Sequence, residues 1–279
     1  ISTKNKFTYM AISEDEKYVA YGLDNNDTAI ASVENGEVIK RFTGHTQQVK
    51  FVAFSKDGKY LASSSFDSTC IIYDIESGEE VAKLEIEGIP MLAKFSEDNT
   101  KLYYVTLVNN DTCFYVYNTD TWQKQGGFVI NGQVKYADIK RDGSEILIAL
   151  EDNTEDQLTR RKMEDGSIID IIPRIKGIAL EQDEFDKPYI AASYSADGKN
   201  IILLTEGDII KISLEDKTEI FKQDIYISPN DTRVLTESYN GEKIAVKAGT
   251  QVYILDGNSG EVVDEIYFPK VNMRYFAYN

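Results

Sequence analysis

Short runs of alternating apolar and polar residues, separated by turns rich in Asp, Asn and Gly, recur along the whole chain. One such unit is residues 49–65, VKFVAFSKDGKYLASSS, which reads as a strand, a turn built on Ser-x-Asp-Gly-Lys and a second strand. The pattern begins again at five further positions: Phe7, Pro90, Val134, Tyr189 and, in a weaker form, Val234. The apolar positions are rich in β-branched and aromatic residues, and no stretch shows a convincing helical period with caps. The sequence therefore predicts an all-β protein built from antiparallel hairpins.

The spacing of these units indicates the architecture. The residues that precede the six turns are Ser13, Ser55, Ser96, Lys140, Ser195 and Asn240, and subtraction gives separations of 42, 41, 44, 55 and 45 residues. A repeat of about 40–45 residues with four strands per unit is typical of the blades of a β-propeller. The single long separation predicts an insertion between the fourth and fifth units.

The number of blades follows less directly from the repeat units than the blade architecture does. Six full units run from about Phe7 to Phe268, and residues 271–279, VNMRYFAYN, read as the inner strand of a seventh. We therefore favour a seven-bladed plan of four-stranded antiparallel blades, with a six-bladed plan as the alternative. Only Ile1–Lys6 precede the first inner strand, which is too little to complete a seventh blade. Residues 1–279 are thus expected to form one propeller domain that is part of a longer protein.

Charge narrows the range of partners. The chain has 47 Asp and Glu residues against 30 Lys and Arg, which gives a formal net charge of −17. Such an excess of negative charge argues against binding nucleic acid or an anionic membrane surface. No apolar run approaches the roughly 18 residues needed to span a bilayer. Composition leaves the compartment open and slightly favours the cytoplasm.

The supply of catalytic residues is poor. His45 is the only histidine, and Cys70 and Cys113 take equivalent strand positions where small buried residues are expected. The sequence has no Gly-x-Ser-x-Gly motif and no Gly-rich loop that would hold a phosphate. One His and two core Cys are too few ligands for zinc. We therefore expect no enzymatic activity, no cofactor and no metal. The alternative is a propeller hydrolase or lactonase that holds a divalent metal in its central channel with Glu, Asn and Asp side chains.

Acidic residues gather in the loops that a propeller places on one face. The loops between the second and third strands carry no Lys or Arg, and their acids are Asp24, Asp27, Asp67, Asp111, Glu151, Asp152, Glu155, Asp156, Glu206 and Asp208. The insertion, residues 177–188 (GIALEQDEFDKP), joins two blades on the same face. One interpretation is that Asp and Asn are there only because tight turns favour them. The other is that this face binds a protein or basic peptide through Asp152, Glu155, Asp156, Glu181, Asp183, Glu184, Phe185 and Asp186.

The second unit resembles a known repeat. Gly44–His45, the strand pair FSKDGKYLASSS and residues 67–74 (DSTCIIYD) are similar to a WD40 repeat, with Tyr73–Asp74 in place of the Trp-Asp pair. The other units keep the strand–turn–strand pattern and lack the His and the Trp. The resemblance to the WD-repeat propeller family implies a buried hydrogen-bonded tetrad of His45, Ser65 (or Ser63), Asp67 and Tyr73. It also implies a non-catalytic interaction scaffold or sensing module, and a purely structural spacer is a third possibility.

Overall fold

The computed structural model describes residues 7–23, 25–150, 158–172, 191–205, 207–225, 233–238, 240–248 and 251–267. These residues form strands β1 to β24, which build six four-stranded antiparallel sheets, each made of four consecutive strands. The all-β prediction and the four-stranded blade are confirmed. No helix in the described ranges is long and apolar enough to cross a membrane.

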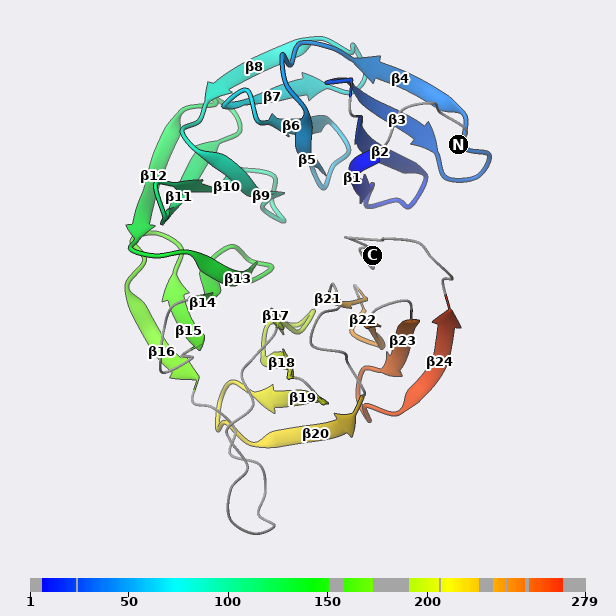
Figure 1. Cartoon of the computed structure of the whole chain (residues 1–279), viewed down its shortest axis with the longest axis vertical. Helices are drawn as coiled ribbons and strands as arrows, with labels where there is room; N and C mark the ends of the chain where they lie inside the picture. Colours follow the sequence, from blue (N-terminus) through cyan, green and yellow to red (C-terminus); the bar gives the residue numbers. More distant parts are fainter. Residues whose placement is uncertain are drawn as a thin grey trace. The chain divides into compact units, whose positions relative to one another are not determined.

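The chain divides into two compact units, the first made mainly of Ile1–Gln133 and the second mainly of Val134–Met163 and Ser167–Tyr278. The first unit holds three blades, whose strands are β1 (Phe7–Ile12), β2 (Tyr18–Leu23), β3 (Thr28–Ser32), β4 (Val38–Phe42), β5 (Val49–Phe54), β6 (Tyr60–Ser65), β7 (Thr69–Asp74), β8 (Glu80–Glu85), β9 (Ile89–Phe95), β10 (Lys101–Val108), β11 (Asp111–Asn118) and β12 (Lys124–Ile130). Inner strands β1, β5 and β9 of this unit follow one another in contact (Figure 1).

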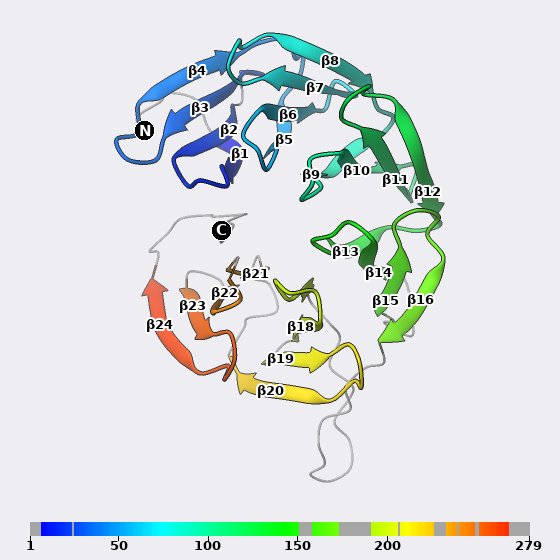
Figure 2. The same cartoon turned by 180° about the vertical axis from the view of Figure 1, so that it is seen from behind.

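The second unit is built in the same way. Its three blades contain β13 (Val134–Ile139), β14 (Glu145–Leu150), β15 (Leu158–Lys162), β16 (Ile168–Ile172), β17 (Ala191–Tyr194), β18 (Asn200–Leu204), β19 (Asp208–Ser213), β20 (Glu219–Asp224), β21 (Arg233–Glu237), β22 (Lys243–Ala248), β23 (Gln251–Asp256) and β24 (Val262–Tyr267). Within it β17 contacts both β13 and β21, so its three blades also follow in sequence. Figure 2 shows this order through the labels β13, β18 and β21.

The favoured count of seven blades is not supported. The described residues form six blades, which is the alternative count. The seventh blade depended on residues 271–279 alone, and these lie outside the described residues.

A repeated Ser-x-Asp turn, with Asn in place of Asp in the sixth blade, closes the first hairpin of five of the six blades. In the second blade Ser55 Oγ donates to Asp57 Oδ1 at 2.6 Å and accepts from the Tyr60 backbone N–H at 2.8 Å. The same pair of bonds recurs around Ser13, Ser96, Ser195 and Ser238. Because these bonds are local, the turn forms wherever the sequence repeats.

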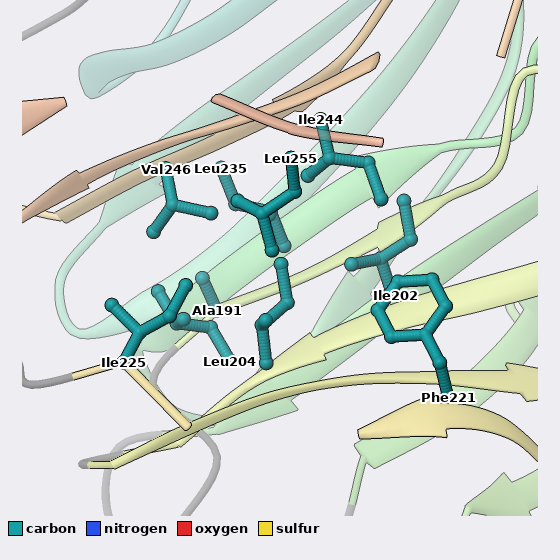
Figure 3. Close-up of a cluster of buried hydrophobic side chains, with 10 residues drawn as sticks. Ala191, Ile202, Leu204, Phe221, Ile225, Leu235, Ile244, Val246 and Leu255 are labelled. Atoms are coloured by element: carbon teal, nitrogen blue, oxygen red, sulfur yellow. The ribbon is translucent and has the colours of Figure 1, made fainter. Parts of the chain in front are cut away.

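The hydrophobic core lies between neighbouring blades. In the second unit Ile202, Leu204 and Phe221 of the β17–β20 blade meet Leu235 and Leu255 of the β21–β24 blade (Figure 3). Alternate residues of a strand point to opposite faces, so a blade can bury apolar side chains on both of its faces. The strand alternation in the sequence is therefore also the pattern of the core.

Cys70 and Cys113 are buried free thiols on β7 and β11, as their positions in the repeat predicted. Burial raises the pKa of the Cys70 thiol to about 12. We expect Cys70 in the folded Cys113→Ser variant to react with an aromatic disulfide reagent roughly 100-fold more slowly than in urea, because the thiolate is the reactive form. Absorbance of the released thiol measures both rates, and equally fast reaction in the folded and unfolded protein would contradict the buried position.

Candidate functional site

The single histidine lies in a closed hydrogen-bonded network of the second blade. His45 precedes β5, and its side chain is 1% exposed. Its Nδ1 atom is 3.0 Å from Asp67 Oδ2, and its Nε2 atom is 3.0 Å from the Ser63 carbonyl oxygen and 3.1 Å from Ser63 Oγ. Both ring nitrogens are thus occupied within the blade.

Asp67 ties the loop before β5 to the turn after β6. Its Oδ2 accepts from the Thr46 backbone N–H at 2.8 Å, and its Oδ1 accepts from Thr69 Oγ1 at 2.7 Å and from the Thr69 backbone N–H at 3.0 Å. Burial raises the pKa of the Asp67 carboxyl, but the bonds from Thr69 and Thr46 and the nearby His45 outweigh it and hold this pKa below its usual value. Asp67 is therefore an ionised and fully engaged carboxylate at neutral pH.

The tetrad that the resemblance implies is formed only in part. Ser63, and not Ser65, lies beside the imidazole; Ser65 Oγ donates to the Gln47 carbonyl at 2.8 Å and accepts from the Asp67 backbone N–H at 3.1 Å. Tyr73 does not reach His45, because its hydroxyl donates to the Thr43 carbonyl at 3.1 Å. Burial raises the pKa of Tyr73, so its hydroxyl stays protonated.

Thr69 also belongs to this network, although its role was not expected from the sequence. Thr69 Oγ1 bonds Asp67 and lies 3.3 Å from His45 Nδ1. The signal that could have found it is the recurrence of Thr as the residue after an acidic turn, at Thr28, Thr69 and Thr112. Thr28 Oγ1 in fact lies 2.7 Å from Ser63 Oγ, which joins the first blade to the second.

The acids of the loop face that the structure describes bond to groups within their own blades. Asp67 is buried in the network, Asp111 Oδ1 accepts from the Gly132 N–H at 3.0 Å, and Asp208 Oδ1 lies 3.4 Å from Lys222 Nζ. Asp27 Oδ2 accepts from Asn25 Nδ2 at 2.8 Å. These four acids fit the interpretation that turns favour Asp. The other candidates lie outside the described residues: Asp24, Glu151, Asp152, Glu155, Asp156, Glu181, Asp183, Glu184, Phe185, Asp186 and Glu206. Within the described ranges, no three His, Cys, Asp or Glu side chains are grouped so that they could hold a metal ion.

A cavity of about 490 Å³ opens between the first two blades. It is bordered by the Ser-x-Asp turns of both blades, by β3 and β4 of the first and by the end of β7 in the second. We call it the inter-blade cleft, and its lining residues are Ser13, Glu14, Asp15, Tyr18, Ile30, Ile39, Lys40, Phe54, Lys56, Asp57, Gly58 and Ile75. No sequence pattern pointed to it.

The blades and the network together define a class, the WD40-repeat-like β-propeller. Residues 36–74 match the family model "WD domain, G-beta repeat", and they contain the whole His45–Asp67 network. The chain is a WD40-like propeller with one recognisable WD repeat and five divergent blades.

Comparison with solved structures supports the same fold. A chain of Kuenenia stuttgartiensis hydrazine synthase is similar with a TM-score of 0.68 and 12% sequence identity, over 92% of this chain and 78% of that chain. At this identity the similarity shows the fold alone. No curated protein shows a significant sequence match to the chain.

Proposed function

We propose that the chain is a non-catalytic propeller that binds a protein or peptide, as an interaction scaffold or sensing module. The observation that carries this proposal is the state of His45, the only histidine in the sequence. Its side chain is 1% exposed and both ring nitrogens have partners within the blade. General acid–base and nucleophile–histidine catalysis would have to proceed without the residue that most often performs them. The WD-type repeat at residues 36–74 is consistent with an interaction role.

For the binding surface we retain the acidic loop face, centred on its two most acidic segments. Residues 151–157 contribute Asp152, Glu155 and Asp156, and the insertion at residues 177–188 contributes four acids and Phe185. Because Asp67, Asp111 and Asp208 are engaged in their own blades, these segments are the ones we assign to a partner. A Lys- or Arg-rich segment would be attracted by the carboxylates and anchored by the aromatic side chain.

Neutralising the insertion tests this surface. The test variant replaces Glu181 and Glu184 by Gln and Asp183 and Asp186 by Asn, and short labelled peptides that are basic, neutral or acidic are titrated by fluorescence anisotropy at low and high salt. We expect basic peptides to bind most tightly, and we expect the variant to weaken that binding about tenfold and to reduce its salt dependence.

The control removes the same number of charges elsewhere. Glu34, Glu37, Glu76 and Glu79 are exposed on turns that follow the third strands of two blades, and their replacement by Gln should change the affinity less than about twofold. The acidic loop face would be refuted as the binding surface if the three peptides bound with equal affinity. It would also be refuted if the affinity for basic peptides fell equally in both variants.

A propeller hydrolase or lactonase with a metal in the central channel is the second candidate. The observation in its favour is that the similar structure is a chain of an enzyme, hydrazine synthase. This candidate predicts a rise in the thermal unfolding midpoint with a divalent cation, because a ligand that binds only the folded state stabilises it. The interaction module predicts no such rise, so titration with Ca²⁺, Mg²⁺, Mn²⁺ and Zn²⁺ separates the two candidates.

A further inference from the structure

The inter-blade cleft of the first unit has walls that are held at a fixed separation. From β4 of the first blade, Lys40 Nζ donates to the carbonyl oxygens of Ile75 at 2.8 Å and Glu76 at 2.7 Å in the second blade. From the turn of the second blade, Lys56 Nζ lies 2.5 Å from Glu14 Oε2 in the first. Each blade therefore supplies one lysine that bonds across to the other. A cleft braced in this way is preformed, so a ligand would lose little free energy in ordering it.

The floor of the cleft is apolar and continuous with the core. Ile30 is buried, and Phe54 and Ile75 are partly buried against the same cluster of side chains that joins the two blades. Apolar side chains also reach the opening, where the lining residue Ile39 is 52% exposed and the lining residue Tyr18 is also exposed. The volume of about 490 Å³ is within the range of specific ligand sites and exceeds what one side chain fills.

The lining of the cleft carries one more carboxylate than lysine, which favours a cationic ligand over an anionic one. Both lysines of the lining are already engaged, Lys40 with carbonyl oxygens and Lys56 with Glu14 and with Glu97 at 3.7 Å. The carboxylates of Asp15 and Asp57 each use Oδ1 in their own turn, through Ser13 and Ser55. Asp15 Oδ2 faces Lys17 Nζ at 3.2 Å, but this pair is exposed and contributes little. The opening thus presents the carboxylates of Glu14, Asp15 and Asp57 against the two lysines Lys40 and Lys56, next to an apolar floor.

We propose that the inter-blade cleft is a peptide-binding site that takes a bulky apolar side chain on its floor and an adjacent Lys or Arg at Asp15 and Asp57. A peptide fits better than a small apolar molecule because the lining combines an apolar floor with the carboxylates of Asp15 and Asp57, and a small apolar molecule would leave these carboxylates unused. The cleft uses other residues than the acidic loop face. It accords with the proposed peptide-binding function, but its test does not depend on the acidic loop face being the binding surface.

The test uses three labelled hexapeptides with the full chain. Gly-Ser-Phe-Arg-Ser-Gly is the probe; Gly-Ser-Ala-Arg-Ser-Gly lacks the apolar anchor, and Gly-Ser-Phe-Glu-Ser-Gly reverses the charge. We expect saturable binding of the first, measured by fluorescence anisotropy. The affinity of the other two should be about tenfold lower, because one loses the apolar burial and the other the attraction to the rim.

Two variants locate the binding. Ile39→Arg places a cation and a long side chain at the opening from a half-exposed position, and it should abolish binding without unfolding the blade. Asp15→Asn with Asp57→Asn removes two rim charges and should weaken the binding of the Phe-Arg peptide about fivefold, whereas the binding of the Phe-Glu peptide should strengthen because its repulsion by the rim is reduced. Asn is compatible with this turn, because Asn240 Oδ1 accepts from Ser238 Oγ at 2.8 Å in the sixth blade.

The matched control makes the same substitution outside the cleft. Asp98 and Asp197 take the same turn position in the third and fifth blades, and each accepts from the serine two residues earlier. The Asp98→Asn, Asp197→Asn variant should bind the probe as the natural chain does. The proposal is overturned if the probe does not bind, if Ile39→Arg leaves its binding unchanged, or if the two double variants lose affinity equally. It is also overturned if the Phe-Arg and Phe-Glu peptides bind alike and indole displaces both, which would assign the cleft to a small apolar ligand.

Discussion

Lys211→Met is expected to lower the free energy of unfolding by about 3–5 kcal/mol, because it leaves a buried carboxylate without its cation. Lys211 lies on β19 and Glu237 at the end of β21, with side chains 7% and 3% exposed. Lys211 Nζ is 3.0 Å from Glu237 Oε1 and donates to the Gly257 carbonyl at 2.7 Å. Glu237 Oε2 also accepts from the Ala196 backbone N–H. The pair therefore joins the fifth and sixth blades where water is excluded.

Urea unfolding followed by far-UV circular dichroism measures this change in the free energy of unfolding. A double variant and a control variant show whether the buried charge is its cause. Replacing both residues, Lys211→Met with Glu237→Gln, should cost less than the sum of the single changes, since no unpaired charge remains. The matched control is Lys217→Met, which breaks the ion pair of Lys217 with Asp170 between partly exposed side chains and should cost less than about 1 kcal/mol. If Lys211→Met costs no more than Lys217→Met, the pair is not buried as described.

Asp67→Ala is expected to cost about 3–5 kcal/mol, because it removes the acceptor that organises the second blade. The change leaves the Thr46 and Thr69 backbone N–H groups and Thr69 Oγ1 without their acceptor, and it removes the partner of His45 Nδ1. Adding His45→Ala should increase the loss by less than the single His45→Ala change does, because the two residues act in one network.

The effect of Asp67→Ala should depend on pH in one direction. The pKa of Asp67 is below its ordinary value of 3.8, so its contribution is fully present above that value and is lost as the pH falls through the lower folded-state pKa. The difference between the natural chain and the variant should therefore shrink in acid. Asp111→Ala is the control, because Asp111 is the partly exposed acid of the equivalent loop. Its Oδ1 accepts from the Gly132 N–H. The substitution should lower the free energy of unfolding by about 1 kcal/mol. Equal losses for the two substitutions at neutral pH would contradict the role of Asp67.

Much of the local structure could be predicted from the sequence because its causes are local. A serine and an aspartate two residues apart close the same turn in blade after blade, and alternation of apolar residues marks the two buried faces of each strand. The buried positions of Cys70 and Cys113 followed from their place in the repeat. The residues of the candidate site could be predicted from the sequence only in part. His45 and Asp67 could be named from one WD-like repeat, while Thr69 and the choice of Ser63 over Ser65 depend on which side chain the imidazole faces.

The tertiary structure decided what depends on contacts between blades. Lys211 follows two isoleucines on β19 and would pass for an outward-facing polar residue, but its partner Glu237 comes from the next blade. The inter-blade cleft likewise needs turns that are 42 residues apart in sequence, Lys56 with Glu14, to lie against each other. The sequence by itself determined strands, turns and the blade repeat, because these arise from bonds between residues a few positions apart. Which polar groups are buried, which acids are engaged and where a cleft opens are set by the packing of one blade on another, and the repeat pattern does not say which polar side chains that packing brings together.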